Sequence, residues 1–204
     1  MFCIYICDNF SKANFKKIND LLLPLFRKKV SFFKNKKKEK IKIISYFLLQ
    51  IGLINLFGIK KVNKIYYSKY GKPYLKKNKN VHFNISHTNN VVACAISSSK
   101  VGIDILNRDI KINKNIVYEL FSKNEIKLWK LSKSKKDKFL EIWTQKEAYI
   151  KYNGLSVNHK IANIDTTNLK INTISTKNYL FSYMCKFKLN KLIFVSNPNN
   201  IIFN

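Results

Sequence analysis

Three short stretches of the sequence carry side chains that could do chemistry. The first ends an apolar segment in Ser86 and His87, a hydroxyl and an imidazole that could both contact an anion. The second is the alternating segment 101–106, in which Asp104 stands among apolar residues. A carboxylate there is costly unless it is paired or binds a cation. Ordinary alternatives exist for both: a turn with a surface histidine, and an edge-strand aspartate that faces water.

The third stretch has the apolar spacing of a helix and carries Glu147 and Lys151 four residues apart, on one face. The ordinary interpretation is a solvated ion pair worth about 0.3–0.5 kcal/mol. However, Trp143, Tyr149 and Ile150 lie in the same stretch and leave little of this helix free for solvent. The pair is therefore a candidate for a functional role.

Together, in this order and spacing, the three stretches resemble the Sfp-type 4′-phosphopantetheinyl transferases. The family pattern reads G-K-P, F-N-x-S-H-S, G-[IV]-D-[IV]-E, F-[ST]-x-x-E and W-[TS]-x-K-E-[AS]-[YF]-x-K. The matching stretches here are 71–73, 83–87, 102–106, 121–125 and 143–151. The motifs lie within residues 71–156, and the segment 1–70 fits the family more loosely.

Two positions depart from the family pattern. Leu106 stands where many members carry a second metal-binding glutamate, although some members also have an apolar residue there. After the last motif the family usually reads G-x-G-L, whereas this chain reads Gly154-Leu155-Ser156, which predicts a shortened loop. An alternative is therefore a catalytically impaired member that only binds a carrier protein or coenzyme A.

The resemblance implies transfer of the phosphopantetheine arm of coenzyme A to a serine of an acyl or peptidyl carrier protein, with release of adenosine 3′,5′-bisphosphate. It implies Mg²⁺, with Mn²⁺ as a substitute, and coenzyme A as co-substrate. Asp104 and Glu147 match two metal ligands of the family. Glu147 also matches the residue proposed to take the serine proton, directly or through a water, and Lys151 would contact the pyrophosphate. The carrier and its pathway, such as fatty acid biosynthesis, stay open.

The remaining residues implied by the resemblance form two groups. The coenzyme A group holds Lys72, Pro73, Ser86, His87 and Lys151, with Lys29 and Lys42 aligned less securely. The carrier-docking group holds Lys111 and Phe121, between the Asp104 strand and the next helix.

The elements that must position these residues form an α+β pattern with mostly antiparallel strands. Strands are expected at 1–8, 65–67, 81–85, 91–96 and 101–106, helices at 41–59, 116–130 and 137–152, and short strands after 161. The family fold implies two similar halves, each a long helix packed on a three-stranded antiparallel sheet, with the active site between them. Residues 1–100 would bind coenzyme A and 101–204 would carry the metal and catalytic residues. The length suggests a monomeric pseudo-dimer.

The charge fits an acidic partner without proving one. The 204 residues hold 39 Lys+Arg against 11 Asp+Glu, a formal net charge of +28. Lys, Asn and Ile make 90 of the residues, and their A/T-rich codons can account for much of the basicity. Only two of the 39 cations are arginine, which argues against a specific reader of nucleic-acid bases. An acidic carrier protein would be attracted to such a surface.

No membrane contact and no secretion are expected. The apolar segment 43–59 has 17 residues and contains Ser45, Gln50 and Asn55, whereas a spanning helix needs about 20 mostly apolar residues. The first eight residues lack the basic opening and long apolar middle of a signal peptide. The four cysteines form no C-x-x-C pair, so reduced thiols are expected in the cytoplasm or in the stroma or matrix of an organelle.

Overall fold

The first sheet forms around the apolar opening strand of the chain. The computed structural model describes residues 1–113, 115–156 and 161–200. β1 (Phe2–Asp8) pairs antiparallel with β5 (Val91–Ser97), which pairs antiparallel with β4 (His82–His87). On its other side β1 pairs in parallel with β9 (Lys191–Phe194), which gives the order β4-β5-β1-β9. The expected three-stranded antiparallel sheet therefore has a fourth, parallel strand from the far end of the chain, which no local pattern could place.

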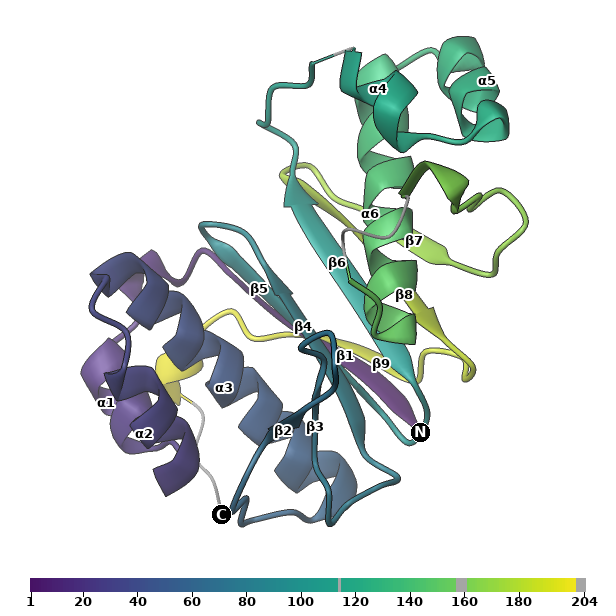
Figure 1. Ribbon diagram of the computed structural model, residues 1–204. Helices are drawn as coiled ribbons and strands as arrows, with labels where there is room; N and C mark the ends of the chain where they lie inside the picture. Colours follow the sequence, from purple (N-terminus) through teal and green to yellow (C-terminus); the bar gives the residue numbers. More distant parts are fainter. Residues whose placement is uncertain (114, 157–160, 201–204) are drawn as a thin grey trace.

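One face of this sheet is covered by helices (Figure 1). α3 (Lys36–Phe57) packs on β5 and β1, and α1 (Phe15–Asp20) and α2 (Pro24–Ser31) pack on α3. Asn35 caps α3 by accepting from the amide of Lys38, so the helix begins in the basic run rather than at residue 41. Gly58, with φ of 64°, ends it. The short strands β2 (Tyr66–Tyr67) and β3 (Pro73–Tyr74) form a separate ribbon.

α3 is the membrane candidate of the chain. By length and composition it could cross a bilayer, but 61% of its most apolar window is buried inside the protein. Ile44, Phe47 and Leu48 are fully buried. The helix therefore packs as the core helix of the first sheet, as the sequence predicts.

The second sheet is three-stranded and antiparallel, as expected. β6 (Val101–Asn107) pairs with β8 (Tyr179–Cys185), which pairs with β7 (Asn172–Ser175). α6 (Lys135–Asn153) packs along β6 and β8. Short 3-10 turns lie at Phe10–Lys12, Ile161–Asn163 and Pro198–Asn200.

The prediction of a single helix at 116–130 is wrong. The structure has two helices there, α4 (Asn115–Leu120) and α5 (Lys123–Leu131). Ser122 separates them because its hydroxyl accepts from the amide of Glu125 while the Glu125 carboxylate accepts from the amide of Ser122. This reciprocal capping box starts a new helix and overrides the continuous apolar spacing.

The inner faces of the two sheets share one apolar cluster. It contains Ile4 and Ala93 of the first sheet together with Ile103 and Phe181 of the second. Alternation along β6 therefore turns Ile103 and Ile105 toward the first sheet and Asp104 toward α6. The predicted boundary between the two halves, at residues 100 and 101, falls between β5 and β6. β9 comes after this boundary in the chain but belongs to the first sheet, so the division into two halves stays a prediction.

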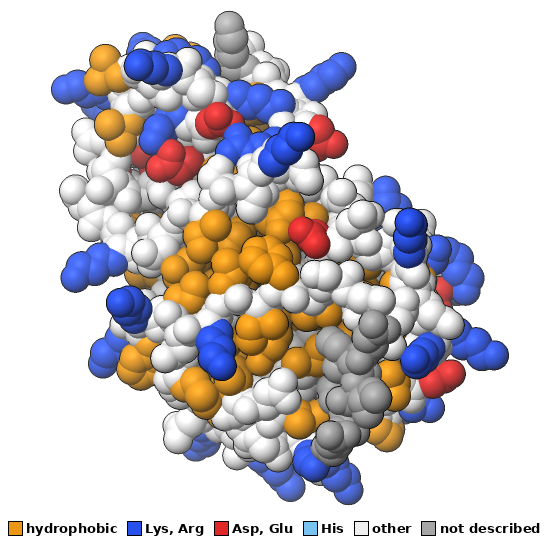
Figure 2. Space-filling model, turned by 180° about the vertical axis from the view of Figure 1, so that it is seen from behind, with side chains coloured by type: hydrophobic (Ala, Val, Ile, Leu, Met, Phe, Trp, Pro, Cys, Tyr) orange, Lys and Arg blue, Asp and Glu red, His pale blue; other side chains and the backbone are white. Residues whose placement is uncertain are grey.

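The face opposite the view of Figure 1 is apolar at its centre. Figure 2 shows hydrophobic side chains gathered there, with lysines and arginines scattered around them. Partly buried Ile174, Leu189 and Leu192 extend the cluster between the sheets toward the surface.

Candidate active site

Gly102 allows β6 to lie directly against α6. A methyl group on Gly102 would lie 2.1 Å from the carbonyl oxygen of Ala148 and 2.4 Å from the amide nitrogen of Tyr152. Both are backbone atoms of α6, so nothing larger than glycine fits unless the strand or the helix moves. Two residues further along β6, Asp104 is carried to the same helix, where Glu147 and Lys151 lie.

Gly102→Ala is expected to lower the free energy of unfolding by about 1–3 kcal/mol, the usual cost of overpacking. It should also disturb any function that needs Asp104 and Glu147 together, because the helix and the strand must separate. Chemical denaturation measures the loss. The matched control is Gly52→Ala in α3, whose nearest neighbours are side-chain atoms of Ile96 and Tyr5 at 3.0 and 3.2 Å. Equal stability of Gly102→Ala and wild type would contradict the close approach.

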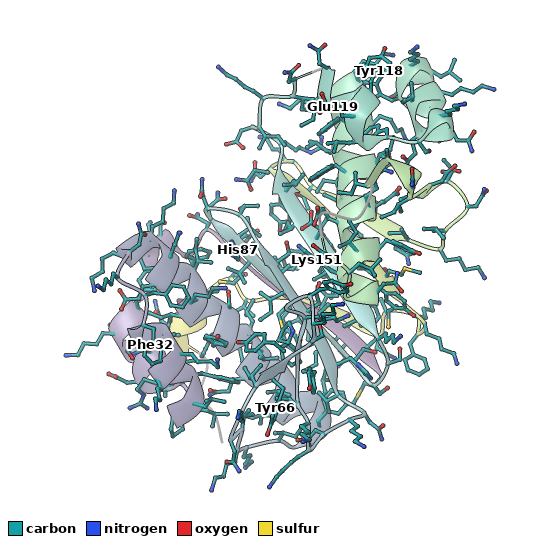
Figure 3. The ribbon with its side chains drawn as sticks, viewed as in Figure 1. Phe32, Tyr66, His87, Tyr118, Glu119 and Lys151 are labelled. Atoms are coloured by element: carbon teal, nitrogen blue, oxygen red, sulfur yellow. The ribbon has the colours of Figure 1, made fainter. Side chains whose placement is uncertain are left out.

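Ser86, Asp104 and Lys151 form one hydrogen-bonded cluster, although they come from β4, β6 and α6. The Ser86 hydroxyl donates to Oδ1 of Asp104 at 2.8 Å. The Lys151 ammonium donates to the same oxygen at 2.5 Å and to Oγ of Ser86 at 3.1 Å. Ser86 and Asp104 are buried, with exposed fractions of 5% and 6%. Figure 3 shows Lys151 and His87 between the two sheets' helices.

Glu147 lies beside this cluster, one turn before Lys151 on α6. Burial and the negative charge of Asp104 raise the pKa of Glu147, and the positive charge of Lys151 lowers it in part. The expected ion pair between Glu147 and Lys151 is wrong: among the described residues, the ion pair of Lys151 is with Asp104. Asp104 reaches Lys151 from the neighbouring strand, and a contact between elements is not visible in helical spacing.

The two carboxylates suit a divalent cation. Mg²⁺ binds through one or two carboxylates and completes its shell with waters and substrate phosphates. Asp104 and Glu147 are close enough for one charge to raise the pKa of the other carboxyl, and a bound cation would remove that repulsion. Within the described ranges no group of three or more His, Cys, Asp or Glu could hold a metal alone. The donor set therefore fits a metal that is shared with a phosphate-bearing substrate.

A cavity of about 250 Å³ brings together several predicted coenzyme A residues. Lys42, Pro73 and His87 all line it. Desolvation and the charges of Lys42 and Lys151 lower the pKa of His87, so its imidazole favours the neutral form. Lys29 reaches the rim, since its ammonium donates to the hydroxyl of Tyr67, another lining residue, at 3.2 Å. An aromatic wall with cations at the rim suits a phosphorylated aromatic ligand.

Lys72 is placed differently from the rest of this group. It lines a second cavity of about 180 Å³, which shares only Pro73 and Phe83 with the first. Its ammonium donates to the carbonyl oxygens of Val101 at 3.0 Å and Tyr152 at 2.9 Å. Burial and the charge of Lys100 lower the pKa of Lys72 to about 8. Its contact with a nucleotide stays a prediction.

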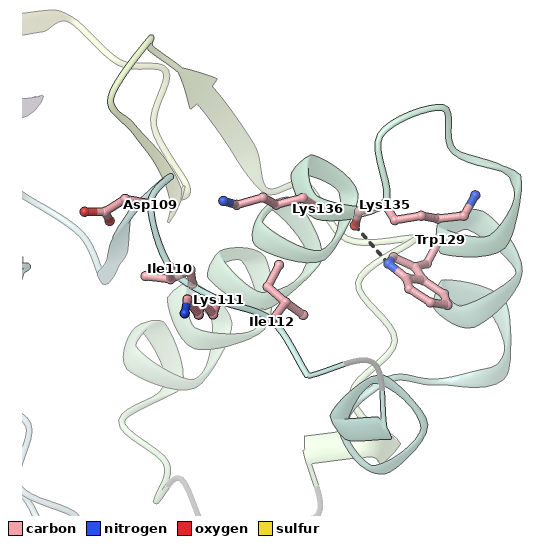
Figure 4. Close-up of a pocket in the computed structure, with 7 residues that line it drawn as sticks. All are labelled: Asp109, Ile110, Lys111, Ile112, Trp129, Lys135 and Lys136. Carbon is pink, nitrogen blue, oxygen red and sulfur yellow. Dashed lines mark hydrogen bonds between the residues drawn. The ribbon is translucent and has the colours of Figure 1, made fainter.

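The two predicted docking residues lie in different environments. Lys111 is exposed and lines a cavity of about 490 Å³ beside α5 and the start of α6 (Figure 4). Phe121 is only 3% exposed and stacks on Phe139 at 5.3 Å between ring centroids. Phe121 therefore cannot contact a partner, and its assignment as a docking residue is wrong. The aromatic side chain fills the core between α4 and α6 instead.

Glu125 and Lys146 belong to the motifs quoted above, but the sequence alone did not assign a role to either of them. They form an ion pair at 2.7 Å in which both side chains are fully buried. Glu125 also accepts from the amide and hydroxyl of Thr166 at 2.9 and 2.7 Å. Lys146 donates to the carbonyl of Ile161 at 2.9 Å. Two opposite charges in motifs that otherwise carry chemistry were the signal for this structural pair.

The two departures from the family pattern lie at the edge of the site. Leu106 is partly buried against the apolar cluster of α4, α5 and α6. Its aliphatic side chain offers no ligand atom to a metal. Gly154 ends α6 with φ of 65°, and the amide of Leu155 donates to the carbonyl of Ile150 at 3.0 Å. Residues 157–160, which follow Ser156, are outside the described ranges, so the shortened loop stays a prediction.

Comparison with known proteins gives one consistent result. Residues 100–200 match the 4′-phosphopantetheinyl transferase superfamily. The chain is 37% identical over 124 residues to 4′-phosphopantetheinyl transferase gsp of Aneurinibacillus migulanus, across 59% of this chain and 51% of that protein. It is 29% identical over 154 residues to 4′-phosphopantetheinyl transferase Sfp of Bacillus subtilis strain 168, across 74% of this chain and 68% of that protein. The matched part thus spans about half the length of the first relative.

Proposed function

The chain belongs to the 4′-phosphopantetheinyl transferase superfamily, and from this premise we propose that it transfers 4′-phosphopantetheine from coenzyme A to a serine of an apo carrier protein. The other product is adenosine 3′,5′-bisphosphate. The observation that carries the proposal is the convergence of Ser86, Asp104 and Lys151 in one hydrogen-bonded cluster beside Glu147. Such a cluster offers carboxylates for a cation, a base and an ammonium, which are the groups that phosphoryl transfer needs.

Glu147 is suited to be the general base. Its raised pKa brings a carboxylate closer to the range in which it can take a proton from a hydroxyl. In the proposed step the serine oxygen forms a bond to the β-phosphorus of coenzyme A and its proton passes to Glu147, directly or through water. The bond from phosphorus to the bridging oxygen breaks, and that oxygen leaves as part of the bisphosphate.

Lys151 and Asp104 act on the phosphates. The Lys151 ammonium lies 2.5 Å from Asp104 and can turn toward an incoming pyrophosphate oxygen, where it neutralises charge that develops on the leaving group. Asp104 and Glu147 would hold Mg²⁺, or Mn²⁺, which polarises the pyrophosphate when bound. Ser86 and His87 would contact the phosphates, and the cavity of Lys42 and Pro73 would take the adenosine end.

The partner proposal rests on the cavity beside Lys111. Ile110, Ile112 and Trp129 line it with apolar side chains, and Lys111, Lys135 and Lys136 outnumber the one acidic lining residue, Asp109 (Figure 4). Trp129 is held in place because its indole N–H donates to the carbonyl of Lys135 at 2.9 Å. An apolar lining with an excess of cations complements an acidic amphipathic helix, the kind of surface that a carrier protein presents.

We also propose that the chain is a monomer built as two related halves. Each of α3 and α6 covers one sheet, and the candidate site lies between these two units. The protein would function in a reducing compartment. Cys3, Cys7 and Cys94 are buried free thiols, and burial raises the pKa of Cys7 to about 12, so none needs an oxidising environment.

The proposal is tested by the mass of a carrier protein. Incubation of an apo carrier with coenzyme A, Mg²⁺ and the protein is expected to add one phosphopantetheine group. Chelation of the metal should abolish the gain, and added Mg²⁺ or Mn²⁺ should restore it. Several carriers of fatty acid, polyketide and peptide synthesis should be tried, since their preference is open. Binding of a carrier or coenzyme A without any mass gain would instead support the alternative, a non-catalytic binding protein, which Leu106 favours.

A further inference from the structure

The outer edge of β6 is bonded by side chains rather than by a neighbouring strand. In the described sheets β6 pairs with β8 alone. On its other edge the amide of Ile103 donates to Oδ1 of Asn84 at 2.8 Å. The amide of Ile105 donates to Oγ of Ser86 at 3.3 Å. Both acceptors lie on β4, two residues apart, and both donors lie on β6, two residues apart, so the spacing matches the period of a strand.

Lys72 continues this row at the start of β6. Its ammonium donates to the carbonyl of Val101 at 3.0 Å, and Val101 is again two residues from Ile103. The same ammonium donates to the carbonyl of Tyr152, near the end of α6. Lys72 therefore ties the loop before β3 to both the strand that carries Asp104 and the helix that carries Glu147.

We propose that Asn84 and Lys72 are positioning residues, which hold the outer edge of β6 so that Asp104 stays against α6. Asp104 lies between the two bonded amides of Ile103 and Ile105. The role of this position in phosphopantetheine transfer rests on the proposed function, whereas the junction itself does not.

The junction has a physical reason. Asn84, Ile103 and Ile105 are buried, with at most 6% of their surface exposed, so an amide without an acceptor there would remain unsatisfied. Direct backbone pairing would draw β4 and β6 to about 4.8 Å. Acceptors on side chains hold the strands further apart and leave Ser86 free to donate to Asp104 at 2.8 Å. These bonds thus hold the outer edge of β6 in place while Ser86 and Asp104 stay in contact within the candidate site.

Two variants of nearly equal shape separate bonding from packing. Asn84→Val removes the acceptor, whereas Asn84→Thr keeps a hydroxyl on β4. A hydroxyl is also the group by which Ser86 accepts from the amide of Ile105. Amide exchange measured by NMR should be about tenfold faster at Ile103 in the Val variant than in the Thr variant, because an unpaired edge opens more readily. The matched control is Asn107→Leu, since the Asn107 side chain bonds to Asn90 outside the junction.

Kinetics test the positioning role. With a carrier that wild type modifies, Asn84→Val should lower kcat about tenfold and raise the Mn²⁺ concentration for half-maximal rate, since a misplaced ligand weakens the transition state. Because Asn84 also lines the cavity proposed for the adenosine end, KM for coenzyme A can rise as well, and the fall in kcat is the readout of positioning. Asn84→Thr should recover much of the kcat and of the Mn²⁺ dependence. Lys72→Met should show the same pattern. The inference is overturned if exchange at Ile103 is equal in the Val and Thr variants, or if the Asn84 and Lys72 variants change only KM for coenzyme A. If wild type modifies no carrier, the proposed function fails and exchange alone still decides the junction.

Discussion

Glu147→Gln is expected to slow phosphopantetheine transfer at least about a hundredfold, because a general base alone contributes about 10²–10⁴-fold. Asp104→Asn should have a similar effect by removing the other carboxylate that suits the cation. Neither variant should unfold the protein. Burial and the charge of Asp104 raise the pKa of Glu147, so Glu147→Gln relieves repulsion and should leave the melting temperature equal or higher. Asp104→Asn relieves the same repulsion but also removes the ion pair with Lys151, so its melting temperature should fall while the protein stays folded.

The rates are measured by mass spectrometry of the carrier, and the fold by circular dichroism. The matched control is Glu141→Gln, on the same helix, where the carboxylate pairs with Lys138 at 2.6 Å and both side chains are about one third exposed. This variant should keep the wild-type rate. Near wild-type rates in both Glu147→Gln and Asp104→Asn would show that the assignment of roles is wrong.

Lys146→Met is expected to lower the free energy of unfolding by about 3–5 kcal/mol, the cost of leaving a buried partner unpaired. Glu125 would remain as a carboxylate with no exposed surface, and its hydrogen bonds to Thr166 would not replace the lost ion pair. The double variant Lys146→Met with Glu125→Gln should recover part of the loss, since it leaves no charge behind and keeps an amide oxygen for the amide of Thr166. Urea denaturation of the two single variants and the double variant measures the coupling.

The control for this pair is Lys138→Met. Its partner Glu141 is 35% exposed, so the loss should stay below about 1 kcal/mol. Equal losses in Lys138→Met and Lys146→Met would contradict the special role of burial. A large loss of transfer in the Lys146 variant, with unchanged stability, would place this lysine in the chemistry instead.

The sequence alone predicted the kinds of group and much of the secondary structure. The strand around Asp104, the helix around Glu147 and Lys151 and the long core helix all follow from alternation or helical spacing, which depend on neighbours along the chain. The break at Ser122 was local too, but its capping box was outweighed in the prediction by continuous apolar spacing.

Contacts between distant elements were decided by the tertiary structure. Lys151 binds Asp104 instead of Glu147, Lys72 binds two backbone carbonyls, Phe121 lies in the core, and β9 joins the first sheet. Each depends on which surfaces meet once loops close and apolar faces are buried, and local spacing carries no information on that. The motifs thus fixed which side chains are available for chemistry, while the packing of α6 on β6 and the bonded edge of β6 decided which of them meet.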